Sequence, residues 1–222
     1  MSLTTPLAVT AALAAGYWFG LRERCVRWGA TATEAAAPMP GDELLAAPDL
    51  MTTRAVTIAA EPAAIWPWLV QFGPGRGGAY TYDWIENLFG LNMHSADHIL
   101  PQFQHVSVGD SFALGPGGPR MAVRIVEPER ALVFAAADGT WVWSFALRPV
   151  AGGTRLISRN RIKAASRVPG TTVAYALVME PASLVMERKM LLGFKERGER
   201  TQARLRELDA IDALPQPAAA GR

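Results

Sequence analysis

The alternation of apolar and polar residues predicts a strand followed directly by a helix in the first third of the chain. In residues 53–59, Val56 and Ile58 recur at every second position among β-branched neighbours, which favours a strand. Glu61 and Pro62 then open a helix, because proline suits the first helical turn and an acidic residue complements the positive end of the helix dipole. We expect one apolar stripe along that helix, formed by Ile65, Trp66, Leu69 and Val70.

The dipeptide Asp138-Gly139 marks the clearest β-hairpin in the sequence. Residues 131–137 and 140–148 alternate on either side of it, and the dipeptide is typical of a two-residue type I′ turn. Side chains of a strand point alternately to opposite faces, so one face of this hairpin is strongly aromatic. The cross-strand pairs expected on that face are Ala136 with Trp141, Phe134 with Trp143, and Leu132 with Phe145.

A second hairpin through residues 149–153 leads into a strand over residues 154–164. We expect this strand to have an inner face of mixed character and a basic outer face. The inner face contains Leu156, Ser158, Asn160 and Ile162, and the outer face contains Arg155, Arg159, Arg161 and Lys163. The register that fits both hairpins places Leu147 opposite Leu156 and Trp143 opposite Asn160.

Helical spacing over residues 171–208 predicts a long C-terminal helix, with a kink at Pro181 because proline removes one helical hydrogen bond. A shorter helix is expected over residues 80–89. The order of elements is therefore a strand, two helices, a run of antiparallel strands and a long helix. This order indicates an α+β fold in which the last helix covers one face of the sheet.

Residues 1–21 contain no charged side chain and predict a membrane anchor. A spanning helix needs about 20 residues, at a rise of about 1.5 Å each. Arg22, Arg24 and Arg27 follow the apolar segment, and the positive-inside rule places that end in the cytoplasm. We therefore expect a single-pass protein of the cell membrane with its domain on the cytoplasmic side. A short helix docked on the domain is one alternative. A cleaved signal peptide is another, although no positive region precedes the apolar run.

The remaining chain divides into three parts. Residues 22–51 are expected to form a tether, because their later portion is rich in proline, alanine and acidic residues. Residues 52–209 form the folded domain. Residues 210–222 are rich in proline and alanine and are expected to be a disordered tail.

Composition limits the classes of function. The chain has 222 residues, of which 50% are hydrophobic, and this suits one domain with a substantial core. A net charge of only +2 argues against a nucleic-acid-binding protein. The single cysteine, Cys25, excludes an internal disulfide and a cysteine-rich zinc site. The glycine-rich loop at residues 73–78 lacks the lysine and hydroxyl residue of a phosphate-binding loop, so we expect no nucleotide there. We expect no other cofactor and no metal.

Three stretches give the chain a recognisable family character. They are the strand-to-helix segment 53–73, the segment 75–110, and the run Arg27-Trp28-Gly29-Ala30-Thr31. Together they resemble the SRPBCC, or START-like (Bet v 1-like), superfamily, and within it a bacterial polyketide cyclase/dehydrase-like subgroup. The likeness covers about residues 22–200. It implies a helix-grip fold, in which a curved antiparallel sheet wraps around a long C-terminal helix and leaves a cavity for an apolar ligand.

We expect the walls of such a cavity to come from the aromatic hairpin, the second helix and the long helix. Ordinary core packing is the alternative for each of these residues. Ser158 and Asn160 are the polar side chains on the inner face of their strand, and a buried polar group needs a partner, which a ligand can supply. The candidate ligand-binding residues are Phe134, Trp141, Trp143, Phe145, Ser158, Asn160, Trp84, Tyr80, Met179 and Met186.

Proton transfer is the chemistry that the polar residues near the second helix suggest. His94 and Asp97 are candidates at the cavity mouth, and Asp83 or Glu86 becomes a general base with a raised pKa if it lies in an apolar cleft. Surface or structural roles are the alternative. His94 and His98 have a helical metal-ligand spacing, but the segment is too short a helix to support a metal site.

These observations lead to one preferred function and two alternatives. We expect a membrane-tethered protein that binds, carries or senses a small apolar ligand, such as a lipid, an isoprenoid or a polyketide-like molecule. The basic face of Arg155, Arg159, Arg161 and Lys163 is a second candidate contact with anionic lipid headgroups. A polyketide cyclase or dehydratase that uses His94, Asp97 or Asp83 is the enzymatic alternative, and a partner-binding module is the other.

Overall fold

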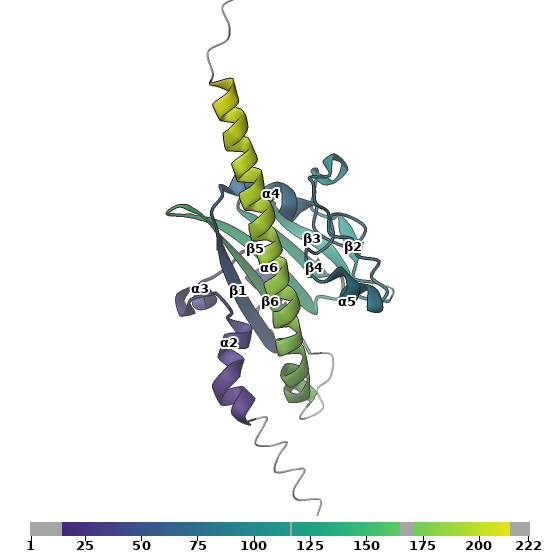
Figure 1. The fold of residues 1–222 in the computed structure, drawn as a ribbon. Coiled ribbons are helices and arrows are strands. Elements are labelled where there is room, and N and C mark those ends of the chain that lie inside the picture. The colour runs from purple at the N-terminus through teal and green to yellow at the C-terminus, as the bar shows by residue number, and fades with distance from the viewer. Residues whose placement is uncertain (1–14, 116, 165–170, 214–222) are drawn as a thin grey trace, which may run out of the picture.

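The computed structural model of the protein describes residues 15–115, 117–164 and 171–213. Within these residues, six strands form one antiparallel sheet in the order β1-β6-β5-β4-β3-β2 (Figure 1). The strands are β1 (Leu50–Ile58), β2 (Ser111–Ala113), β3 (Arg120–Glu127), β4 (Ala131–Ala136), β5 (Trp141–Val150) and β6 (Gly153–Ile162). The α-helices are α2 (Arg22–Val26), α3 (Ala32–Ala36), α4 (Pro62–Val70), α5 (Asp83–Leu88) and α6 (Thr171–Asp212).

The strand-to-helix junction has the predicted form. β1 ends at Ile58, and α4 begins at Pro62 with Glu61 as its N-cap residue in an extended conformation. Proline costs nothing at this position, because the first amides of a helix have no partner within the helix. Ile65 and Leu69 of α4 are fully buried against the inner face of the sheet.

The register of the two hairpins confirms the prediction that one face is aromatic. Phe134 lies opposite Trp143, and Leu132 lies opposite Phe145. On the other side of β5, Trp143 lies opposite Asn160, and Leu147 opposite Leu156. Because this register is shared across β4, β5 and β6, the aromatic side chains all point towards α6.

The turn at Asp138-Gly139 differs from the predicted type I′ turn. A type I′ turn needs positive φ at both central residues, but Gly139 has φ 71° and Asp138 is not among the described residues with positive φ. The Gly139 amide donates to the Ala136 carbonyl at 2.9 Å, so the chain turns one residue earlier. The Asp138 carboxylate accepts from the Thr140 amide and stabilises this wider turn.

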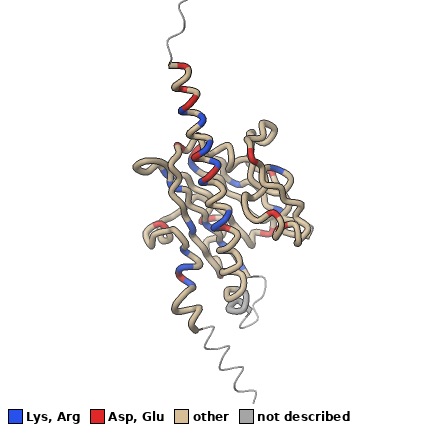
Figure 2. The backbone as a smooth tube through the Cα atoms, in the orientation of Figure 1, with Lys and Arg blue, Asp and Glu red and all other residues tan. Residues whose placement is uncertain are grey.

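The long helix α6 crosses the inner face of the sheet and extends beyond it (Figure 1). Its C-terminal half carries most of its charged residues (Figure 2), and its apolar residues Met190, Leu191 and Phe194 are buried in the core. The helix continues past the predicted end at Leu208 and includes Pro181.

The second helix is shorter than predicted. Tyr80 has φ 58°, a left-handed conformation that a helix cannot contain, and α5 begins only at Asp83. Gly193 of α6 allows the backbone at Tyr80 to pack directly against the long helix. A Cβ at this glycine would lie 2.6 Å from the Tyr80 carbonyl oxygen, so only glycine lets the helix approach so closely.

Most of the predicted membrane anchor, residues 1–14 of 1–21, lies outside the described residues. The rest of it forms a helical turn (Tyr17–Leu21) that runs into α2. Among the residues that the structure covers, no helix combines the length and the apolar character needed to cross a bilayer. The predicted tail, residues 210–222, begins within α6, and residues 214–222 lie outside the described part of the chain.

The segment expected to be a tether lies against the outer face of the sheet instead. Its helix α3 begins with a capping box, in which Thr31 and Glu34 satisfy each other's amides. Met39 then packs on three buried residues of that face, namely Ala55, Ala146 and Ile157. Residues 30–45 therefore form a third layer of the domain on this face, whereas Leu50 and Met51 already belong to β1.

This layer covers the basic strand face, so the expectation that the face contacts headgroups is corrected. Arg159 is only 2% exposed and donates to Asp42 and to the backbone carbonyls of Glu34, Ala35 and Ala37. The other cations also bind the covering segment: Arg155 pairs with Glu34, Arg161 with Asp42 and Lys163 with Asp49. The Arg155 guanidinium, which donates to the Glu34 carboxylate, lowers the pKa of Glu34 to about 2. The acidic residues that made the segment resemble a tether are the counter-charges of the strand.

We expect Arg159→Ala to destabilise the protein by about 3 kcal/mol, because it removes the donor of three backbone carbonyl groups and one of the two cations that pair with Asp42. Urea unfolding measures the loss, and limited proteolysis should show faster cleavage within residues 22–51. Arg24→Ala is the matched control, since Arg24 is exposed, and it should change stability by less than about 0.5 kcal/mol. Equal stability of the two variants would show that the covering segment is not held by Arg159.

Candidate functional site

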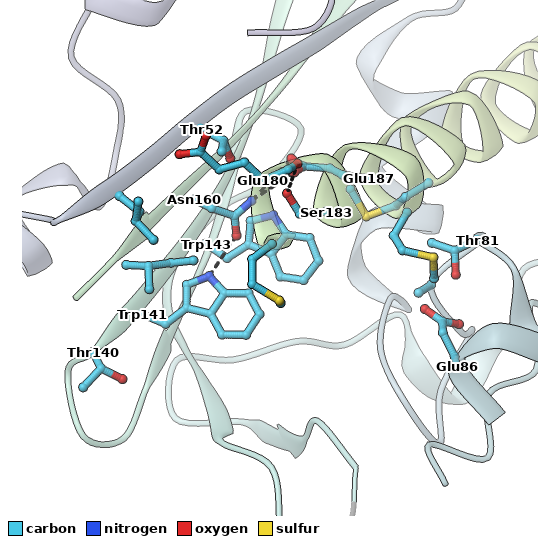
Figure 3. Close-up of a pocket in the computed structure, with 16 residues that line it drawn as sticks. Thr52, Thr81, Glu86, Thr140, Trp141, Trp143, Asn160, Glu180, Ser183 and Glu187 are labelled. Carbon is cyan, nitrogen blue, oxygen red and sulfur yellow. Dashed lines mark hydrogen bonds between the residues drawn. The ribbon is translucent and has the colours of Figure 1, made fainter. Parts of the chain in front are cut away.

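A cavity of about 360 Å³ lies between the inner face of the sheet and the N-terminal half of α6 (Figure 3). The walls come from β1, β5, β6, α6 and the segment that leads into α5. The apolar lining consists of Leu50, Ala79, Trp141, Trp143, Ile162, Met179, Met186 and Met190. The polar lining consists of Thr52, Thr81, Glu86, Thr140, Asn160, Glu180, Ser183 and Glu187.

Two indole rings form the aromatic wall. Trp141 and Trp143 occupy the same face of β5, and their rings stack with centroids 5.7 Å apart and an interplanar angle of 17°. The Trp141 Nε1–H donates to Asn160 Oδ1 at 2.8 Å, and the Trp143 Nε1–H donates to Ser158 Oγ at 2.9 Å. Both hydrogen bonds fix the orientation of the rings in the cavity wall, because each indole has a single donor to commit.

Ser158 and Asn160, which accept from the two indoles, themselves donate to a buried carboxylate. Glu187 of α6 accepts from Ser158 Oγ at 2.6 Å and from Asn160 Nδ2 at 3.3 Å. It also forms an ion pair with Arg54 of β1. The side chains that orient both indoles therefore converge on one residue of the long helix, and Figure 3 shows this for Asn160 and Glu187.

Arg54 is completely buried, and its remaining donors are also satisfied. Its Nε donates to the Cys25 carbonyl at 2.9 Å, and its Nη2 donates to Ser183 Oγ at 3.0 Å. A buried guanidinium needs such a full set of acceptors, because desolvation of an unpaired charge is costly. Sequence reasoning missed Arg54. The signal was its position on the same face of β1 as the apolar residues Val56 and Ile58.

The opposite end of the cavity contains a different carboxyl group. Glu86 of α5 is 9% exposed, and burial raises the pKa of its carboxyl; the nearby Thr81 hydroxyl opposes this rise, and the Asp83 carboxylate adds to it by a smaller amount. Glu86 Oε2 and the hydroxyl of Thr81 have no hydrogen-bond partner among the described residues, and the same holds for the hydroxyl of Thr52. Three polar atoms of the cavity wall are therefore buried without partners, and such groups usually have one.

The predicted ligand-binding residues divide into three groups. The cavity lining contains Trp141, Trp143, Asn160, Met179 and Met186. Phe134, Phe145 and Tyr80 are buried in the packed core, and Ser158 lies behind Trp143 as its acceptor. The Tyr80 hydroxyl donates to the Trp68 carbonyl at 3.0 Å, so it is committed within the core. Trp84 is 66% exposed on the outside of α5.

The three predicted proton-transfer residues are not among the lining residues. Asp83 accepts from the amide and hydroxyl of Ser95 at 2.7 and 2.6 Å, so it ties the following loop to α5. His94 is exposed. Asp97 has an 86% exposed side chain that pairs with Arg197 at 3.5 Å. The carboxyl group that lines the cavity is that of Glu86, one helical turn from Asp83. The sequence alone did not show which of these two residues faces the cavity, because that depends on the orientation of the short helix α5.

We expect Glu187→Gln to destabilise the protein by about 3 kcal/mol, because it leaves the buried Arg54 without its counter-charge. Urea unfolding followed by circular dichroism gives the free energy. Glu196→Gln is the control, since Glu196 is an exposed residue of the same helix and should have almost no effect. A loss below about 1 kcal/mol would show that the Arg54–Glu187 pair contributes little.

No family model and no curated protein matches the chain. Solved structures with a similar arrangement include the KanY protein, which is 16% identical over 68% of this chain and 97% of its own, with a TM-score of 0.44. A Polyketide_cyc-like protein from Corynebacterium glutamicum is 17% identical over 75% of this chain and 97% of its own, with a TM-score of 0.33. An AHSA1-like protein from Aeromonas hydrophila is 16% identical over 76% of this chain and 99% of its own, with a TM-score of 0.38.

All three TM-scores lie below 0.5, so the fold is assigned from the topology of the chain itself. β1 is followed by α4 and α5, then by a meander of antiparallel strands that closes back on β1 through β6. The last helix, α6, lies across the inner face with a cavity beneath it. The chain therefore has a helix-grip fold, which is the fold that its resemblance to the SRPBCC, or START-like, superfamily implied.

Proposed function

We propose that the protein binds a small, largely apolar ligand in the cavity beneath α6, as a carrier or sensor of that ligand. The observation that carries this proposal is the open volume beneath α6, whose wall includes the two stacked indole rings that hydrogen bonds to Asn160 and Ser158 hold in place. Small-molecule sites are typically concave, mostly apolar and furnished with a few convergent polar groups. The cavity has this character.

The volume restricts the size of the ligand. About 360 Å³ lies near the lower end of the range for small-molecule pockets, which begins at roughly 300 Å³. A molecule of one or two rings, or a short isoprenoid or polyketide-like chain, fits such a space, whereas a two-chain lipid exceeds it. Met179, Met186 and Met190 line the α6 side, and their flexible side chains let the wall adapt to different shapes.

Binding is a better match to the cavity than the cyclase or dehydratase reaction. The candidates for proton transfer, His94, Asp97 and Asp83, are absent from the described lining. The polar network of Glu187, Ser158 and Asn160 is internally satisfied and holds the wall in place.

We also propose that residues 1–21 attach the domain to the cell membrane, with the domain on the cytoplasmic side. The support is their uncharged, apolar sequence and the cations that follow it. The described part of this segment presents Phe19 and Leu21 to solvent, at 89% and 54% exposure. Exposed apolar side chains next to Arg22 are typical of a membrane boundary.

Native mass spectrometry of the full chain tests the ligand proposal. We expect an apolar molecule to remain bound after purification, and Met186→Trp to abolish its binding by filling the cavity. Val185→Trp is the matched control, because Val185 is the neighbouring residue, is 53% exposed and does not line the cavity. Ligand-free protein in several preparations, together with no effect of Met186→Trp on the binding of any apolar probe, would refute the proposal.

Membrane fractionation tests the attachment. We expect the full chain to sediment with membranes and to resist a carbonate wash, since an apolar helix is not released by charge screening. Deletion of residues 2–14 should release the protein while leaving all described contacts intact. Release of the full chain by carbonate would contradict the proposal.

A further inference from the structure

The ionisable side chains that line the cavity are acidic, although much of the lining is aromatic or aliphatic. Among the lining residues that the structure describes, three are glutamates, namely Glu86, Glu180 and Glu187, and none is lysine, arginine or histidine. Two of the glutamates have a cation behind the wall. Arg54 pairs with Glu187, and Arg22 pairs with Glu180 at 2.7 Å.

Glu86 has no such partner among the described residues. Its side chain is more than nine-tenths buried, and its Oε2 has no donor. The hydroxyl of Thr81, which also lines the cavity, is likewise unsatisfied among the described residues. Figure 3 shows Glu86 and Thr81 together on the side of the cavity that faces away from β6. A buried carboxylate with a free oxygen is costly unless a cation or a donor reaches it.

The opposite wall, which contains Trp141 and Trp143, suits a cationic ligand better than an anionic one, because its indole and amide donors are already used. The indole donors of Trp141 and Trp143 are committed to Asn160 and Ser158. The Asn160 amide is committed to Glu187. What remains for a ligand on this wall is the apolar surface of the two stacked indole rings, which have no free donor for an anion.

We propose that the cavity selects apolar molecules that carry a protonated amine, with the Glu86 carboxylate and the Thr81 hydroxyl receiving the ammonium group and the indoles of Trp141 and Trp143 packing on the apolar body. This inference rests on the proposed binding function and names the chemical class of its ligand. The ammonium group donates to Glu86 Oε2, which otherwise has no donor, and it compensates the one glutamate that lacks a cation. A carboxylic acid or a phosphate would bring a second negative charge to an unpaired buried carboxylate, so anionic apolar molecules are excluded.

Three probes with one ring system separate the chemistry of the head group from the burial of the ring. They are 2-(1-naphthyl)ethylamine, 2-(1-naphthyl)ethanol and 1-naphthylacetic acid, each titrated into the full chain by calorimetry at neutral pH. We expect the amine to bind at least tenfold more tightly than the alcohol, and the acid to bind most weakly. Tenfold corresponds to about 1.4 kcal/mol, which is modest for a charge-assisted hydrogen bond in a buried site.

The Glu86→Gln variant locates the effect. It keeps the shape of the side chain and removes its charge, so the affinity for the amine should fall at least tenfold while that for the alcohol changes less than threefold. Glu196→Gln is the control at an exposed position and should leave all three affinities unchanged. If Glu86→Gln does not fold, the ranking of the three probes on the unaltered protein decides the question alone.

The outcomes separate this inference from the function on which it rests. Equal binding of the amine and the alcohol, or full retention of amine binding in Glu86→Gln, would overturn the amine class and leave a cavity for neutral apolar ligands. Tightest binding of the acid would overturn it as well. Failure of all three probes to bind, with no competing molecule found by native mass spectrometry, would overturn both the inference and the proposed function.

Discussion

The ion pair between Arg54 and Glu187 is the interaction on which the arrangement of the cavity depends. It joins the edge strand β1 to the long helix α6, and neither charge is accessible enough to be solvated on its own. A buried pair of this kind contributes little net stability compared with apolar packing, but breaking it is costly, so it fixes which face of the helix meets the sheet. Through Ser158 and Asn160 the same carboxylate orients both indoles.

The space between the sheet and α6 is packed at one end and hollow at the other. Near α4, the rings of Phe72, Phe145 and Phe194 contact one another at centroid distances of 5.7 to 6.1 Å and fill the interior. Towards the N-terminal half of α6 the polar network replaces this packing, and the side chains that remain do not close the volume. Buried polar groups demand specific partners, so they hold a wall in place without filling the space in front of it.

The outer face of the sheet shows how strongly the surroundings decide the role of a charged residue. Arg159 belongs to a row of cations that could equally well face water, anionic lipid or protein. In the structure it is buried beneath residues 22–51, where acidic side chains and backbone carbonyls meet it. Just before this segment, the Tyr17 hydroxyl donates to Glu180, a residue of the cavity wall that also pairs with Arg22, so the proposed membrane attachment contacts the proposed binding site directly.

The local pattern of the sequence determined the strand-to-helix junction, the register of both hairpins, the long C-terminal helix and the two tryptophans of the aromatic wall. These features depend on the alternation of side chains along a strand and on turn residues, which are encoded within a few positions. Only the tertiary structure decided the partners of Arg54, the burial of the basic face and the choice of Glu86 over Asp83 for the cavity. Each of these depends on which distant side chain lies within about 3 Å, and neither spacing nor composition specifies that distance before the layers are assembled. The hollow beneath α6 has the same origin, because it is set by how closely two layers approach and not by the residues of either layer alone.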